Sequence, residues 1–209
     1  MLSAKVSDPD WERETRNKTF DRLETSRDKG FAFFVHQELG LTFGELQSVY
    51  MELMTSVQKQ NLTLVVKLHP RYKEARQEWA NWANEIDSSS EAILFLSDEC
   101  TSFDLCVACD LCIAVYSTVV IEALICRKPV VLLKYVNVPW QLPYGEKYQV
   151  FEQVSEVSQL DAAIAKALDS AEQEDTQRQI DYFLSQELCG LDGKSVQRMR
   201  DLIVERSRN

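Results

Sequence analysis

Two pairs of residues that could hold a phosphate group lie far apart in the sequence. His69 and Pro70 follow one apolar run of strand length. Ser117 and Thr118 follow another and precede an apolar helical pattern. Imidazole and hydroxyl groups donate hydrogen bonds to phosphate oxygens, and the start of a helix offers free backbone N–H groups to an anion. The two pairs therefore predict one anion site, although His69 alone would equally fit a surface histidine in a turn.

Charged residues stand beside both pairs. Lys67 and Arg71 flank His69 and add two cations at the same strand end. Glu122 lies one turn into the apolar helix that follows Thr118, where a carboxylate is unfavourable unless it has a partner. The two hydroxyl groups of a ribose would supply that partner, and the alternative is a first-turn glutamate favoured by the helix dipole. Together with the phosphate pairs, Glu122 favours a nucleotide as the ligand.

A third strand end supplies further candidate residues. His36 and Gln37 directly follow the aromatic-rich run at residues 31–35. Ligands of parallel α/β sheets bind at the carboxyl ends of the strands. We therefore expect His36, His69 and Ser117 to converge on one crevice, although they are distant in sequence.

The cysteines do not predict a metal site. Cys106, Cys109 and Cys112 have the spacing C-x-x-C-x-x-C, but no fourth cysteine follows at ferredoxin spacing and Cys112 falls in an apolar run. Packing in the core is the favoured interpretation, and Trp79 and Trp82 are interpreted as packing residues too. The sequence has neither a Gly-x-Gly-x-x-Gly nor a Walker motif, which disfavours dinucleotide oxidoreductases and P-loop NTPases.

The elements that must position these residues alternate between strand and helix. Such alternation predicts a single Rossmann-like α/β domain with a doubly wound parallel sheet and right-handed crossovers. Thr42 and Glu45 form a capping box that opens the clearest amphipathic helix. The expected strands are residues 31–35, 62–68, 92–96, 111–115 and 130–133.

The two ends of the chain differ from this pattern. Residues 1–30 are polar and suit a linker or a surface helix, so the nucleotide-binding domain is predicted to span residues 31–206. A long loop that contains Trp140 is expected at residues 134–148. Additional C-terminal helices are predicted at 158–171, 175–188 and 195–206, with Ser158 and Asp161 capping the first and Gly190 and Gly193 separating the last two.

Composition limits the classes of function. The chain has 209 residues, 45% of them hydrophobic, which is enough for one well-buried core. A net charge of −10 disfavours nonspecific binding of nucleic acid or of a membrane through basic residues. No apolar run approaches the roughly 20 residues that span a bilayer, so any membrane association would be peripheral. Six cysteines within largely apolar runs and no secretory signal favour a cytoplasmic location with reduced thiols.

The motifs together resemble a known family. The segments Val-Val-Lys-Leu-His-Pro-Arg ending at Arg71, Asp-Leu-Cys-Ile-Ala-Val-Tyr-Ser-Thr ending at Thr118, and Lys-Pro-Val-Val ending at Val131 resemble the carboxyl-terminal half of GT-B glycosyltransferases with an HP and an S/T motif. Those families include capsular polysaccharide transferases, bacterial sialyltransferases and CDP-glycerol glycerophosphotransferases. UDP-GlcNAc 2-epimerases resemble the same pattern more loosely.

The resemblance implies a function for the matching residues. His69, Pro70, Ser117, Thr118 and Glu122 would hold the nucleotide part of an activated sugar or glycerol donor of CMP, CDP or UDP type, without a separate cofactor. Catalysis would need a second α/β half or subunit, because in those families the facing half supplies the acceptor site. The alternatives are a non-catalytic nucleotide-binding or scaffold module and one half of an epimerase-like enzyme. The catalytic residues are not predicted.

Overall fold

A computed structural model describes residues 8–24, 28–37, 39–86, 92–96, 98–136, 147–188 and 191–206. The side chains of Pro70, Arg71 and Lys73 lie outside this description. So do Trp140, with most of the loop predicted at 134–148, and Gly190.

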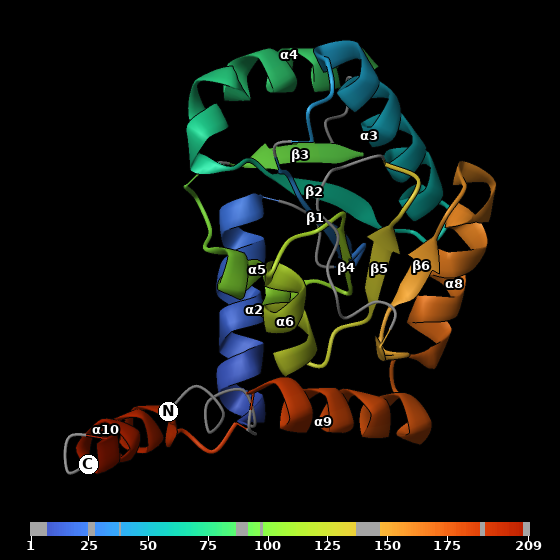
Figure 1. Ribbon diagram of the computed structural model, residues 1–209. Helices are drawn as coiled ribbons and strands as arrows, with labels where there is room; N and C mark the ends of the chain where they lie inside the picture. Colours follow the sequence, from blue (N-terminus) through green and yellow to red (C-terminus); the bar gives the residue numbers. More distant parts are fainter. Residues whose placement is uncertain are drawn as a thin grey trace.

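A parallel sheet forms the centre of the molecule. Within the described residues it has six strands in the order β3-β2-β1-β4-β5-β6 (Figure 1). The strands are β1 (Phe31–Val35), β2 (Thr63–Lys67), β3 (Ile93–Leu96), β4 (Leu111–Ala114), β5 (Val130–Leu133) and β6 (Glu152–Val154). All five neighbouring pairs are parallel. The doubly wound Rossmann-like fold predicted from the sequence is therefore confirmed.

Helices cover both faces of this sheet. The described helices are α2 (Pro9–Leu23), α3 (Phe43–Gln58), η1 (Pro70–Ala75), α4 (Arg76–Ile86), α5 (Ser102–Ala108), α6 (Val119–Ile125), η2 (Val157–Gln159), α8 (Leu160–Ser170), α9 (Glu174–Leu188) and α10 (Ser195–Arg206). Apolar side chains of α3, α4 and α8 pack on one face, and those of α2, α5, α6 and α9 pack on the other. Figure 1 shows α3 and α4 on the side of the sheet away from α2 and α5.

The strand sequences explain why both faces are covered. Every residue of β1 and of β4 is buried, as expected for central strands between two layers of helices. Along β1, Ala32 and Phe34 point into the core beneath α3, whereas Phe31 and Phe33 point into the core beneath α5 and α6. The continuous apolar run of β1 therefore contributes side chains to the hydrophobic cores on both faces of the sheet.

The amino-terminal segment forms a helix that packs on the domain. Asp8 caps α2 by accepting from the backbone N–H of Asp10 at 3.0 Å. Phe20 is buried and its ring meets Phe31 edge to face at 5.4 Å, while Trp11 contacts Phe103 of α5. Within the described residues of this polar segment, Pro9–Leu23 therefore form a helix.

Two local predictions have opposite outcomes. The capping box at Thr42 and Glu45 is confirmed, because each residue bonds to the backbone N–H of the other. The cap predicted at Ser158 is wrong. Glu156 and Gln159 form the capping box there, and a 3-10 turn precedes α8. Ser158 is the middle residue of that turn, so it is not at an N-cap position.

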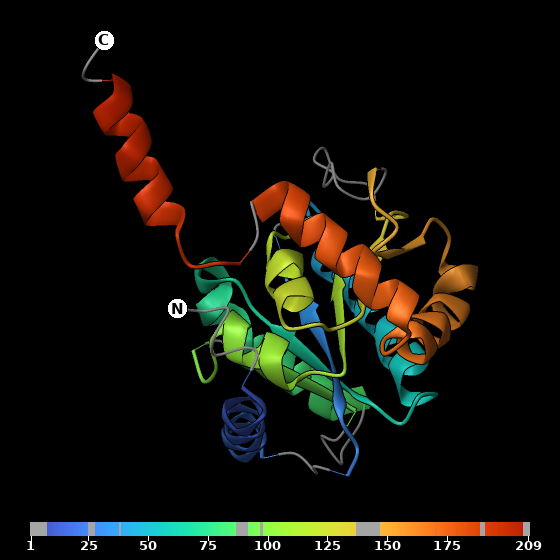
Figure 2. The ribbon, with the colours of Figure 1, turned by 90° about the horizontal axis from the view of Figure 1, so that it is seen from below.

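The C-terminal part contains one unexpected strand and one isolated helix. Strand β6 extends the sheet beyond β5, and its three residues are too few to show a periodic pattern in the sequence. Helix α10 has no buried residue and projects from the rest of the molecule (Figure 2). Side chains of Met199 and Ile203 on this helix are more than half exposed.

Candidate functional site

The chain changes direction across the sheet between β1 and β4. These two strands are neighbours, yet the connection from β1 leads towards β2 and β3, and the connection from β4 leads towards β5. Ligands of open parallel sheets bind at such a switch point, outside the carboxyl ends of the strands. His36 and Gln37 follow β1 there, and residues 115–118 follow β4.

Gln37 joins the two strand ends at the switch point. Its side-chain oxygen Oε1 accepts a hydrogen bond from the backbone N–H of Tyr116 at 3.1 Å. The loop after β1 and the loop before α6 are thus held together next to Ser117. The sequence placed Gln37 among the further candidates, and the structure shows that it positions the loop that carries Ser117.

Ser117 and Thr118 occupy different environments. Ser117 is 7% exposed, and its Oγ accepts from the backbone N–H of Val119 at 3.2 Å. Thr118 is exposed and makes no side-chain capping bond to α6. Ser117 is therefore the residue that caps the short helix, while its own hydroxyl proton can still be donated to a ligand.

Glu122 lies on α6, half buried beside the same loop. Its carboxylate makes no hydrogen bond or ion pair with any other described residue, and burial raises its pKa. A half-buried carboxyl group is unfavourable unless it has a hydrogen-bond partner. Among the described residues Glu122 has none, and it lies about one turn beyond Ser117.

The candidate residues at the end of β2 lie in different environments. His69 is exposed directly after β2, which pairs with β1, so only β1 separates it from the strand before Ser117. At about 4.8 Å per strand, His69 and Ser117 start from strand ends about 10 Å apart. Lys67 instead donates through Nζ to the carbonyl of Cys100 at 2.8 Å, towards the segment that follows β3. Pro70 and Arg71 open η1, and their side chains are outside the described part.

His36 is the most enclosed of the candidates. Only 4% of its surface is exposed, and Nδ1 is hydrogen-bonded to the hydroxyl of Tyr50 on α3. Tyr72 meets the imidazole edge to face at 5.0 Å. Burial, with a smaller contribution from His69, lowers the pKa of His36 from 6.5 to about 4. His36 is therefore neutral at pH 7 and cannot serve as a cation for phosphate.

A pocket of about 270 Å³ adjoins His36 and Gln37. It lies between the start of α3 and the first turns of η1 and α4, and Tyr72 and Trp79 line it. The packing role predicted for Trp79 is confirmed, since it is 3% exposed and stacks on Phe95. Sequence reasoning missed the pocket and the role of Tyr50, because apolar spacing marks a core residue without showing that it borders a cavity.

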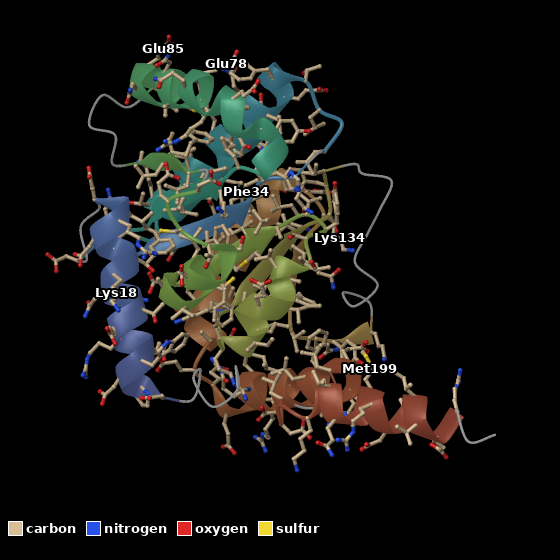
Figure 3. All side chains as sticks on the ribbon, turned by 90° about the vertical axis from the view of Figure 1, so that its left-hand side faces the viewer. Lys18, Phe34, Glu78, Glu85, Lys134 and Met199 are labelled. Carbon is tan, nitrogen blue, oxygen red and sulfur yellow. The ribbon has the colours of Figure 1, made fainter. Side chains whose placement is uncertain are left out.

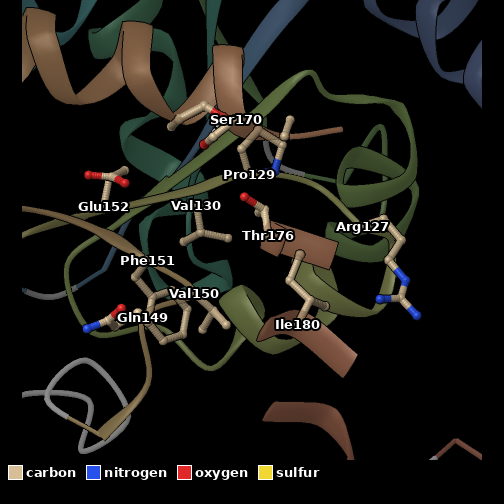
Figure 4. A pocket seen from close by; sticks show the side chains of 12 residues that line it. Arg127, Pro129, Val130, Gln149, Val150, Phe151, Glu152, Ser170, Thr176 and Ile180 are labelled. Carbon is tan, nitrogen blue, oxygen red and sulfur yellow. Dashed lines mark hydrogen bonds between the residues drawn. The ribbon is translucent and has the colours of Figure 1, made fainter. Parts of the chain in front are cut away.

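Other hollows lie at the opposite end of the strands. One of them lies between the start of β5 and helix α9, and Figure 4 shows Arg127, Val130 and Ile180 among the residues that line it. Its volume is about 40 Å³. A second, of about 440 Å³, includes Asp110 and Lys128. Both are at the amino ends of β4 or β5, away from the switch point, so they are not parts of this site.

The predicted thiols are buried in the core. Five of the cysteines lie in the described part of the chain, and each is a free thiol: Cys100, Cys106, Cys109, Cys112 and Cys126. Within the described ranges, no three His, Cys, Asp or Glu residues gather as a metal site would require. No described helix has both the length and the apolar character needed to cross a membrane.

Comparisons with known proteins identify the family and agree with the fold. The family described as CDP-glycerol:poly(glycerophosphate) glycerophosphotransferase matches residues 25–205. None of the curated proteins matches the chain.

Three solved structures illustrate the likeness in fold. Wall teichoic acid polymerase TagF, determined with CDPG, superposes with a TM-score of 0.60 at 20% identity over 98% of this chain and 47% of its own. Anabaena HepE with UDP and glucose gives 0.55 at 15% identity, over 86% and 48%. The UDP-GlcNAc 2-epimerase of Methanocaldococcus jannaschii, with UDP-GlcNAc and UDP, gives 0.56 at 15%, over 80% and 46%. The chain thus spans about half the length of each structure.

Proposed function

The chain belongs to the CDP-glycerol:poly(glycerophosphate) glycerophosphotransferase family, and from this premise we propose that it is the donor-binding half of a GT-B type transferase. Its ligand is the nucleotide part of a CDP-linked or similar activated sugar or glycerol. The observation that carries the proposal is the switch point, where Gln37 fixes the Ser117 loop beside the carboxylate of Glu122, which has no partner among the described residues.

Each candidate residue has a distinct role in this proposal. The Ser117 hydroxyl and the exposed hydroxyl of Thr118 donate to phosphate oxygens. Glu122 accepts from the ribose hydroxyls, which satisfies its carboxylate. His69, two strands away, donates to the phosphate from the other side. Pro70 places Arg71 at the start of η1, near the same phosphate, and Lys67 supports the rim through Cys100.

The proposed chemistry is stabilisation of a leaving group. When an acceptor hydroxyl attacks the donor, the bond to the nucleotide phosphate breaks and negative charge grows on its oxygens. Donors that are already oriented by the fold stabilise that charge more than water does. The hydrogen bond from Val119 holds the Ser117 oxygen before the ligand arrives.

The acceptor and its base come from a second α/β half in this proposal. Bond formation requires reacting atoms held about 3–3.5 Å apart, and the sheet described here forms one side of a crevice. The fold of TagF extends over about twice the length of the matching part. The cytoplasm is the proposed location, which the five free thiols support.

A non-catalytic nucleotide-binding module is the competing proposal. It would use the same crevice without any reaction. Acceptor-dependent release of nucleotide from CDP-linked or UDP-linked donors separates the two, measured with the chain alone and with any α/β protein encoded next to it. Release that depends on the second protein favours a transferase.

Thermal unfolding with CMP, CDP, UMP, UDP and GDP tests the binding proposal. A nucleotide at 100 times its Kd should stabilise the fold by about 2.7 kcal/mol. The double variant Ser117→Ala, Thr118→Ala loses two hydrogen bonds to a charged ligand, so its affinity should fall at least about tenfold. Ser158→Ala, an exposed hydroxyl in η2, is the control and should bind like the parent. Equal affinity of the double variant and the parent would place the phosphate elsewhere.

A further inference from the structure

Helix α10 carries an apolar face that is exposed along its whole length. This apolar face consists of Val196, Met199, Leu202 and Ile203, whose spacing of three or four residues places them along one side of the helix. Each of the four is more than half exposed, and Met199 is labelled on the helix in Figure 3. Single apolar residues are normal on a protein surface, whereas a continuous apolar stripe indicates contact with a partner.

The length of α10 leads to the same conclusion. The helix has 12 residues, and none of them is buried. Isolated helices shorter than about 12–15 residues are only marginally stable in water, because most helices in proteins are stabilised by the packing of an apolar face. Helix α10 therefore needs a surface that covers its apolar face.

The charges of this segment indicate what that surface is. Residues 194–200 contain three cations and no acid, whereas residues 201–206 contain two acids and one cation. Lys194 and Arg198 lie near the start of the helix, where its dipole favours acids, and Glu205 lies in the last turn, where the dipole favours cations. This order of charges is unfavourable for the helix alone. It becomes favourable beside a second helix that has the same charges and runs in the opposite direction.

We propose that the apolar face of α10 binds the same face of α10 in a second copy of this chain, with the two helices antiparallel. A twofold axis between them places the basic half of each helix beside the acidic half of the other. A parallel arrangement would instead place halves of like charge together.

Arg198 and Glu205 are the charged pair that would join the two copies. They are seven residues apart, so they lie on the same side of the helix, next to the apolar face. Glu205 makes no hydrogen bond or ion pair with another described residue. Arg198 pairs with Asp192 at 2.7 Å, and its guanidinium has further N–H donors for a second carboxylate. In the antiparallel dimer each Arg198 pairs with Glu205 of the partner subunit.

The small size of this contact predicts a weak dimer. A helix of 12 residues is about 18 Å long, so two such helices bury less than the roughly 1,200 Å² of a stable complex. The dimer should therefore form reversibly, with a Kd above about 1 μM.

Sedimentation velocity of the full chain over a concentration range of about 1 to 200 μM tests the contact. The sedimentation coefficient of the parent should rise with concentration from that of a monomer towards that of a dimer. The double variant Met199→Gln, Ile203→Gln should remain a monomer, because each change places an amide in the apolar contact. Both residues are exposed, so the fold of the domain should be retained. Gln197→Ala, an exposed position on the opposite side of α10, is the matched control and should dimerise like the parent.

An exchange of charges tests whether two copies of α10 pair with each other. The variant Arg198→Glu, Arg200→Glu has acids in both halves of the helix, and the variant Asp201→Lys, Glu205→Lys has cations in both halves. Each variant alone should remain a monomer because like charges face one another. An equimolar mixture of the two should restore the dimer.

Three results would overturn the proposal. They are a parent that stays a monomer at every concentration, a dimer that survives the two glutamine changes, and a mixture of the charge variants that does not dimerise. Nucleotide binding is measured separately, so none of these results decides the proposed function.

Discussion

Polar side chains at the two ends of the sheet differ in how many of their hydrogen-bonding groups are paired. At the amino end, Asp110 pairs with Arg16 at 2.9 Å and also accepts from the backbone N–H of Phe31 at 2.9 Å. Lys128 pairs with Glu12 of α2 at 3.1 Å. A side chain at Gly30 would place its Cβ 2.5 Å from Asp110 Oδ2, and the positive φ of 55° also favours glycine there.

At the carboxyl end, hydrogen-bonding capacity is left unused. The Nε2 atom of His36, the amide NH₂ of Gln37 and the carboxylate of Glu122 have no partner among the described residues. Buried and half-buried polar groups are normally satisfied in a folded protein. The amino end therefore uses polar groups to hold α2 on the domain, whereas the polar groups at the carboxyl end have capacity left over within the described residues, as the proposed ligand site requires.

The largest expected effect is the response of the carboxyl end to acid. The unfolded chain takes up a proton at His36 near pH 6.5, whereas the folded chain takes it up at about pH 4. The difference between these two pKa values leaves the free energy of unfolding unchanged above pH 6.5. As the pH falls from 6.5 towards 4, it lowers the free energy of unfolding by about 3 kcal/mol in total.

Urea unfolding of the parent and of His36→Gln at pH 7 and at pH 4.5 measures this loss. The variant lacks the ionisable ring, so its stability should fall less between the two pH values. Parallel curves for the two proteins would show that His36 is accessible to protons in the folded state.

The amino end should show an effect on stability alone. Asp110→Ala removes the ion pair with Arg16 and a hydrogen bond to the start of β1, which should destabilise the fold by about 2 kcal/mol. CMP affinity should remain that of the parent, because Asp110 precedes β4 at its amino end whereas Ser117 follows the carboxyl end of the same strand. Asn17→Ala, an exposed position on α2, serves as the control for stability. Weaker CMP binding in Asp110→Ala would show that the two ends are coupled.

The smallest effect concerns the turn from α6 to β5. Arg127 has a φ of 59°, a left-handed conformation that is strained for any residue with a Cβ. Arg127→Gly and Arg127→Ala both lose the ion pair with Asp181, so their difference isolates the strain. The glycine variant should be more stable than the alanine variant by about 1 kcal/mol in urea unfolding. A more stable alanine variant would show that the turn rearranges.

The fold could be predicted because its signals are local. Apolar runs bounded by polar residues mark β1, β2, β3, β4 and β5, and the capping box of α3 involves residues three apart. Strand β6 gave no such signal, because its pairing with β5 rather than its composition makes it a strand. The wrong prediction of a cap at Ser158 has a similar cause. Several polar residues there could cap a helix, and in the structure Glu156 occupies the N-cap position.

The sequence by itself determined which residues follow strand ends: His36, His69 and Ser117. Strand order decided the rest, because residues after β1, β2 and β4 become neighbours only when those strands are adjacent in the sheet. Tertiary structure also buried His36 against Tyr50, which lowers its pKa, and turned Lys67 towards Cys100. Hydrogen-bond partners distant in sequence set the charge and direction of a side chain, and a linear pattern does not contain them.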